Sequence, residues 1–181
     1  MIQVVKQFPV LTVLFVIALI ASVRADTLEA PSTPAEIAVP EGNVLYMEVF
    51  ADGVQIYSCG AKEDGTGYEW AFKAPEAILY DMSMNPIGTH GAGPFWQASD
   101  GSRVEGKVQA KVASSDPTAI PWLLLATTST GSEGMFATTT FIHRLGTVAG
   151  IAPTDGCDEA NAGAEAKIPY TATYYFYEAA Y

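Results

Sequence analysis

The sequence is poor in the groups that bind metals or form covalent intermediates. Its 181 residues include two histidines and two cysteines. No HxH or HExxH spacing of a zinc site is present, and no GxSxG string marks a nucleophile elbow. The GxGxxG fingerprint of a dinucleotide-binding domain is also absent. We therefore expect neither a metal nor a nicotinamide cofactor.

Positive charge is also scarce. Nine lysines and arginines stand against 20 acidic residues, a formal net charge of −11. Without residues 1–25, which resemble a secretory signal, the chain has seven basic and 20 acidic residues, and its formal net charge is −13. Such a surface repels phosphate backbones and anionic lipids, so we expect neither nucleic acid nor membrane as a partner. The acidity also suits a protein that only needs to stay in solution.

Long hydrophobic runs are limited to the N-terminus. Lys6 precedes an apolar run over residues 8–23, and Val23 and Ala25 are small residues at the positions that a signal peptidase reads. This pattern predicts a secretory signal over residues 1–25. A membrane anchor is the alternative, but the run is shorter than the roughly 20 residues of a spanning helix. We therefore expect a secreted, extracellular protein.

The rest of the chain divides into a leader and one domain. Residues 26–43 contain Pro31, Pro34 and Pro40 among polar residues, which is typical of an extended or disordered segment. Residues 44–181 are long enough for a single domain with one buried core.

The two cysteines, Cys59 and Cys157, both fall in the expected mature chain. An even number of cysteines in an oxidising compartment predicts one disulfide between them. Metal binding is the weaker alternative, because no CxxC spacing or histidine cluster accompanies them.

Hydrophobic periodicity indicates strands. In residues 103–112 the apolar positions alternate with charged and amide side chains over ten residues, which predicts an antiparallel strand with one solvent-exposed face. Residues 170–177 alternate likewise, with Tyr170, Ala172, Tyr174 and Phe176 on one face. Further strands are predicted at residues 44–51, 54–59, 68–72, 77–80, 122–128 and 137–145.

The turns and loops between these strands complete the fold prediction. Asp52-Gly53 is a dipeptide that closes tight hairpins, so we expect a turn between residues 44–51 and 54–59. Residues 158–166 could still form a short helix, since Asp158, Glu159 and several alanines suit a first helical turn. Many short strands with glycine and proline between them predict an all-β fold, either an antiparallel β-sandwich or a closed barrel with long Gly/Pro-rich loops.

The segment GTHGAGPFWQASDGS, residues 88–102, holds the strongest candidates for a site. It joins His90, Trp96 and Asp100 to a Gly-Pro turn. His90 and Asp100 are the candidate catalytic pair, with Asp81 as another partner for the imidazole. Trp96 and Asp81 are the candidate ligand-binding residues. Tryptophans of a β-protein more often fill its core, and Trp96 is the best candidate for an exposed one that stacks on a sugar ring. The same residues could equally build a rigid turn.

Several motifs in order resemble a secreted family catalogued as domain of unknown function 3455. They are residues 53–59 (GVQIYSC) and 75–80 (PEAILY), His90 with Gly93-Pro94 and Trp96, then residues 100–102 (DGS), 120–125 (IPWLLL) and 169–174 (PYTATY). Relatives similar to this chain, many of them fungal, often carry the label malate dehydrogenase, which the missing dinucleotide fingerprint argues against. His143 departs from the polar residue that the resemblance implies at its position.

Three functions remain open on these observations. The first is a secreted β-domain that binds a cell-wall or other extracellular carbohydrate, or another small ligand, through the loop of His90 and Trp96. The second is an extracellular hydrolase that uses His90 with Asp100 or Asp81 as acid and base. The third is a structural protein with no small-molecule site.

Overall fold

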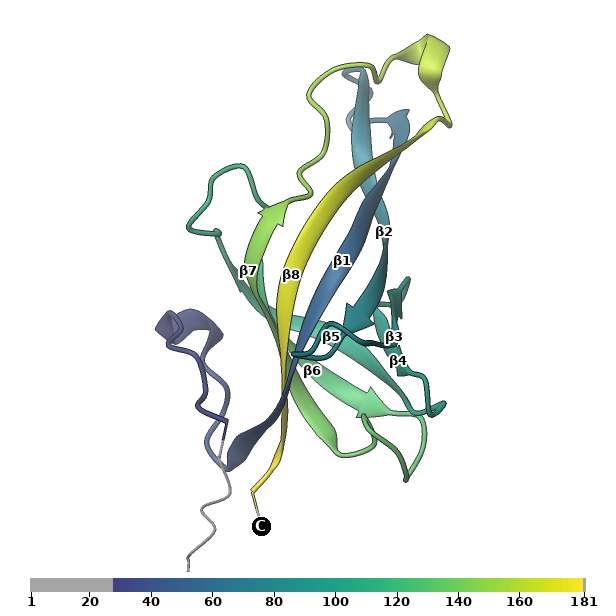
Figure 1. The fold of residues 1–181 in the computed structure, drawn as a ribbon. Coiled ribbons are helices and arrows are strands. Elements are labelled where there is room, and N and C mark those ends of the chain that lie inside the picture. The colour runs from purple at the N-terminus through teal and green to yellow at the C-terminus, as the bar shows by residue number, and fades with distance from the viewer. Residues whose placement is uncertain (1–27, 181) are drawn as a thin grey trace, which may run out of the picture.

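The protein is an antiparallel barrel. The computed structural model describes residues 28–180, so the predicted signal lies outside the described residues. Eight strands follow one another around a closed sheet, in which each pairs with the next and the last pairs with the first (Figure 1). The strands are β1 (Asn43–Ala61), β2 (Tyr68–Tyr80), β3 (Pro86–Gly91), β4 (Phe95–Ala98), β5 (Arg103–Val112), β6 (Trp122–Ser129), β7 (Thr139–Ala149) and β8 (Glu165–Ala179).

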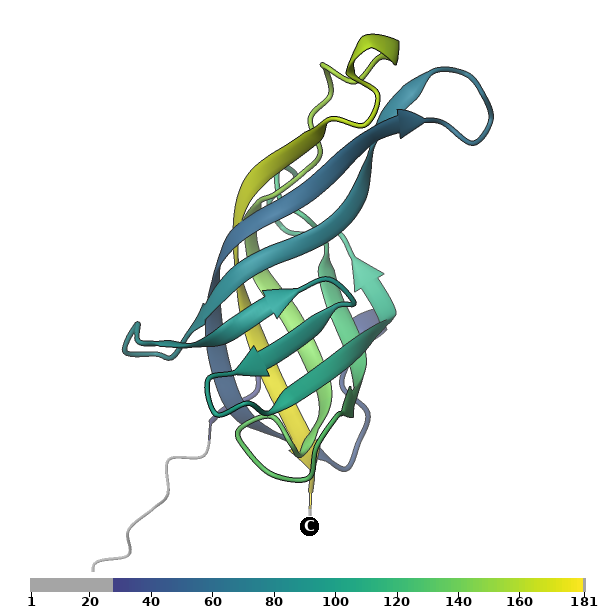
Figure 2. The ribbon, with the colours of Figure 1, turned by 90° about the vertical axis from the view of Figure 1, so that its right-hand side faces the viewer.

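The all-β prediction is confirmed, and of its two architectures the closed barrel is the one found. No helix within residues 28–180 is long and apolar enough to span a bilayer. The strands differ in length: β1 has 19 residues, whereas β4 has four. In consequence β1, β2 and β8 rise well past the short strands β3 and β4, which cover only the lower part of the barrel (Figure 2).

The interior is filled by the alternate side chains of each strand. On β8 the predicted apolar face is confirmed, because Tyr170, Ala172, Tyr174 and Phe176 all lie in the inner core. The Phe176 ring stacks on Phe136 with centroids 4.7 Å apart. Aromatic rings therefore fill much of the barrel, as expected for a sheet of this size.

The expected hairpin at Asp52-Gly53 is wrong. β1 continues through both residues, and Gly53 pairs with Ala77 on β2 and with Tyr170 on β8. A Cβ at Gly53 would lie 2.1 Å from the carbonyl oxygen of Glu76. The glycine is needed for close approach of two strands rather than for a turn.

β5 keeps the predicted alternation only as far as a bulge. Val108 lies opposite Leu125, but after a register shift Ala110 lies opposite Leu124. Leu125 belongs to the inner core, whereas Leu124, Ala110 and Val112 form part of an outer cluster. The prediction of one apolar face along residues 103–112 is therefore wrong, because the bulge moves the later apolar residues to the outside.

The leader covers this outer cluster. It contains the 3₁₀ turn η1 (Ala35–Ile37), which lies beside the barrel (Figure 1). Ile37 is fully buried against Leu124 and Leu145. His143 also holds the turn, because its Nε2 donates a hydrogen bond to the Ile37 carbonyl oxygen at 2.6 Å. The segment before β1 therefore packs as part of the fold.

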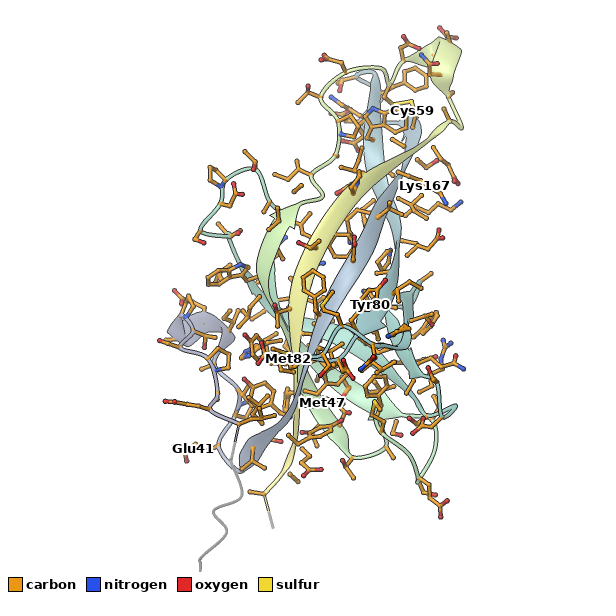
Figure 3. The ribbon with its side chains drawn as sticks, viewed as in Figure 1. Glu41, Met47, Cys59, Tyr80, Met82 and Lys167 are labelled. Carbon is orange, nitrogen blue, oxygen red and sulfur yellow. A yellow bond between two sulfur atoms is a disulfide. The ribbon has the colours of Figure 1, made fainter. Side chains whose placement is uncertain are left out.

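The predicted disulfide between Cys59 and Cys157 is confirmed. It joins the end of β1 to the connection between β7 and β8, near the tip of the long strands (Figure 3). The two cysteines are 98 residues apart, and closing a loop of that length stabilises the folded chain by about 4 to 5 kcal/mol in the chain-entropy model. The helix expected within residues 158–166 is limited to the 3₁₀ turn η2 (Glu159–Asn161).

Replacing Gly53 by alanine tests the close approach of β1 and β2. Gly53→Ala should lower the free energy of unfolding by about 3 kcal/mol, because the new methyl group meets backbone atoms that cannot move aside. Gly60→Ala is the control on the same strand, since a Cβ there meets nothing within 4 Å. Urea unfolding measures both, and equal stabilities of the two variants would contradict the observed pairing.

Candidate functional site

The segment of residues 88–102 forms strands and tight turns rather than an open loop. His90 lies on β3 and pairs directly with Trp96 on β4. The turn between the two strands contains a cis peptide bond between Gly93 and Pro94, and Gly93 has a φ of 145°. Glycine suits this backbone conformation, which other residues rarely adopt. The hairpin therefore places the imidazole and the indole side by side on the inner face of the barrel.

Trp96 and His90 are both buried. The Trp96 side chain is 1% exposed and its ring stacks on His90 with centroids 4.4 Å apart, while Tyr174 packs against both rings. Trp96, the best candidate for an exposed tryptophan, is therefore part of the core instead. The reason lies on the next strand, where a Cβ at Gly106 would come within 2.7 Å of the indole. The missing side chain leaves room for the ring to lie inside.

The His90 imidazole is neutral and offers an acceptor. Its Nδ1 donates a hydrogen bond to the Phe95 carbonyl oxygen at 2.7 Å. Burial lowers the pKa of His90 to about 3, which outweighs the opposite effect of that hydrogen bond. With the proton on Nδ1, the lone pair of Nε2 is available to a donor.

Asp100 stabilises a turn and does not contact His90. One carboxylate oxygen accepts from the backbone N–H and hydroxyl of Ser102, and the other accepts from the backbone N–H of Met135 at 2.7 Å. The hydrogen bond from the Ser102 hydroxyl is the main cause that holds the pKa of Asp100 below its ordinary value. Asp100 therefore joins the β4–β5 turn to the segment before β7.

Asp81 has a similar local role in the turn between β2 and β3. Its carboxylate accepts from the backbone N–H groups of Ser83 and Asn85 and from the Asn85 side chain. The Asn85 side chain is the first cause of its lowered pKa. Of the four predicted site residues, the structure thus brings His90 and Trp96 together and places Asp81 and Asp100 in separate turns.

A cavity opens beside His90 and Trp96, with a volume of about 210 Å³. Every strand except β1 contributes to its lining. Its buried floor consists of His90, Trp96, Leu125 and Tyr174, and the exposed residues Phe72, Lys73 and Val108 lie at its rim. Pro75, Gly93, Pro94, Leu123 and Arg144 complete the wall. The cavity is therefore mostly apolar and aromatic, with two basic side chains.

Arg144 is the lining residue that sequence reasoning missed. It lies on β7 opposite Leu123 and Tyr174, which also line the cavity. Its Nε and Nη2 donate to the Pro121 carbonyl oxygen, at 3.2 and 2.8 Å. Side chains two positions apart on a strand point to the same face, so Arg144 shares the inner face with Ile142. The sequence shows this spacing, but it does not show which face of the strand is the inner one.

The chain matches the model of one protein family, described as "Protein of unknown function (DUF3455)", over residues 40–85 and 81–178. The chain belongs to this family. The resemblance seen in the sequence is thereby confirmed, and the DUF3455 match takes in all eight strands and the whole cavity lining. No curated protein and no solved structure matches the chain. Within residues 28–180 no three His, Cys, Asp or Glu side chains gather as they would around a metal.

The buried His90 of this DUF3455 barrel should make it sensitive to acid. The folded-state pKa of about 3 lies below the ordinary value of 6.5, so the unfolded chain binds a proton first as the pH falls. Stability should therefore decrease as the pH falls from 6.5 towards 3. Between pH 7 and pH 4 the His90 contribution amounts to about 3 kcal/mol.

His90→Gln cannot take up that proton and supplies the comparison. Urea unfolding at pH 7 and pH 4 should show that the variant loses about 3 kcal/mol less than the parent protein over this interval. The buried His143 is present in both proteins, so its own effect cancels. The same pH dependence in both proteins would rule out a neutral, buried His90.

Proposed function

We propose that the barrel binds one small, mainly apolar ligand in the cavity beside His90 and Trp96. The observation that carries the proposal is a cavity that reaches from an exposed rim at Phe72 and Val108 to a buried aromatic floor. An eight-stranded barrel has an interior just wide enough for side chains or for one small ligand. In this barrel side chains fill one part of the interior and leave the other part open.

The volume of the cavity indicates the size of the ligand. Pockets for drug-sized ligands measure roughly 300 to 1,000 Å³, whereas an apolar cavity of about 150 Å³ accepts a benzene ring. At about 210 Å³ the cavity fits a single ring with a short substituent. Such a ligand would contact Trp96 and Leu125 on the floor and Phe72 at the rim.

The polar groups of the floor also support a binding role. The Trp96 indole nitrogen is buried and has no hydrogen-bond partner within residues 28–180. Burial raises the pKa of Tyr174, so its hydroxyl stays protonated, and its contact with the Tyr170 hydroxyl is long at 3.4 Å. A buried donor without a partner costs free energy. A ligand with an acceptor near Trp96 would satisfy that donor.

An apolar ring has more support here than a carbohydrate. Sugar rings stack on an open aromatic face, but His90 stacks on the Trp96 ring and both side chains are buried. The hydrolase alternative has less support as well, because the His90 hydrogen bond goes to a backbone carbonyl and its low pKa makes it a weak base. The proposal is made for a secreted protein, on the signal pattern of residues 1–25 and the disulfide.

Filling the cavity should abolish binding. We expect benzyl alcohol, a neutral single-ring probe, to shift the NMR signals of the Trp96 indole N–H and the Arg144 amide. In Val108→Phe the larger side chain should occupy the cavity, so these shifts should disappear. The matched control is Val44→Phe, because Val44 and Val108 are both 46% exposed on strands and only Val108 lines the cavity.

The indole N–H of Trp70 is an internal reference, since it donates to the Asp155 carbonyl oxygen and does not line the cavity. The proposal fails if benzyl alcohol shifts all indole signals alike. It also fails if the Val108→Phe variant responds like the Val44→Phe variant. Either result would favour a structural protein without a small-molecule site.

A further inference from the structure

Arg144 directs a permanent positive charge towards the inside of the barrel. Side chains on β7 alternate: Ile142 belongs to the inner core, while His143 and Leu145 contact the leader on the outside. Arg144 therefore faces inward, in agreement with its place in the cavity lining. Burial raises the pKa of Tyr174, and the nearby Arg144 charge partly offsets that rise.

No carboxylate of residues 28–180 forms an ion pair with this charge. The ion pairs within residues 28–180 are Lys73–Glu165, Arg103–Glu105 and Lys167–Glu76. Arg144 is in none of them, although acidic residues outnumber basic ones by 20 to nine. Arg144 is half-buried, so its charge has no counter-ion in the structure but remains able to pair with an anion that enters the cavity.

The backbone contact of Arg144 leaves room for such an anion. The Pro121 carbonyl oxygen accepts from Nε and Nη2, which are two nitrogens of the three in the guanidinium. That contact fixes the plane of the group, and the Arg144 side chain also hydrogen-bonds the Tyr174 hydroxyl, which leaves the rest of its five N–H donors for an anion. A fixed, planar set of donors matches the geometry of a carboxylate.

We infer that the ligand is a small aromatic carboxylate, whose carboxylate binds Arg144 while its ring lies against Trp96 and Leu125. This inference rests on the proposed function, because it names the chemical class that the same cavity accepts. The acidic surface repels a carboxylate, so its affinity has to come from local basic side chains such as those of the cavity. Lys73 at the rim adds a second cation, although Glu165 already pairs with it.

Benzoate and benzamide test the inference on the native protein. The two probes have nearly the same shape, but only benzoate is charged. We expect benzoate to bind the native protein about tenfold more tightly than benzamide in an NMR titration, because charge-assisted hydrogen bonds to Arg144 are the stronger ones. Equal affinities would overturn the inference.

Arg144→Gln should remove the preference. Its benzoate affinity should fall about tenfold, while its benzamide affinity should stay within about twofold of the native value. Arg103→Gln is the matched control, because Arg103 stacks over the Phe95 ring, pairs with Glu105 and does not line the cavity. A variant that binds benzoate as tightly as the native protein would overturn the assignment to Arg144.

The failures of the two proposals can be told apart. If benzyl alcohol binds in the cavity but benzoate has no advantage over benzamide, the inference falls and the proposed function stands. If none of the three probes binds, both fall. If Arg144→Gln does not fold, because the contact with Pro121 is lost, the comparison of benzoate with benzamide on the native protein still decides the question.

Discussion

The pairing of β1 with β8 is the constraint on which the rest of the structure depends. It runs from Asn43 and Ala179 at one end to Ser58 and Glu165 at the other, and it turns a meander of hairpins into a closed sheet. Only closure brings Tyr174 of the last strand against His90 of the third, with ring centroids 5.1 Å apart. The cavity exists because side chains from opposite sides of this circle meet without filling it.

The side chains inside the closed sheet differ in size and charge from one side of the cavity to the other. Gly106, which has no side chain, leaves room for the Trp96 ring inside the barrel, where it forms part of the cavity floor. His90 supplies a polar atom at that floor without adding a charge, since burial holds its pKa low. Arg144, held by the Pro121 carbonyl oxygen, brings a permanent charge that faces the apolar floor and has no acidic partner among the described residues. The site combines a ring-sized apolar space with the fixed guanidinium of Arg144.

Sequence patterns predicted what depends on one strand, and they left open or missed most of what depends on two. The alternation over residues 170–177 and the disulfide follow from local pattern and from cysteine number, and both are confirmed. The closed barrel was one of the two predicted architectures, but the choice between them, the continuous course of β1 through Gly53 and the burial of Trp96 all depend on a neighbouring strand, which no local pattern reveals. Arg144 was missed for the same reason: its inward direction is defined by the register with Tyr174.

The bulge in β5 has a consequence for where the folded unit begins. It moves Ala110 and Val112 to the outside of the barrel, next to Leu124, where they would form an apolar patch in contact with water. The proline-containing segment around Ile37 covers that patch. A domain boundary at Val44, as composition suggests, would therefore separate Ile37 from the cluster it belongs to. A chain that began at Val44 would expose this apolar patch, which favours self-association. The part of the chain that folds together therefore includes η1. Through Ile37, the leader covers a second, smaller apolar core.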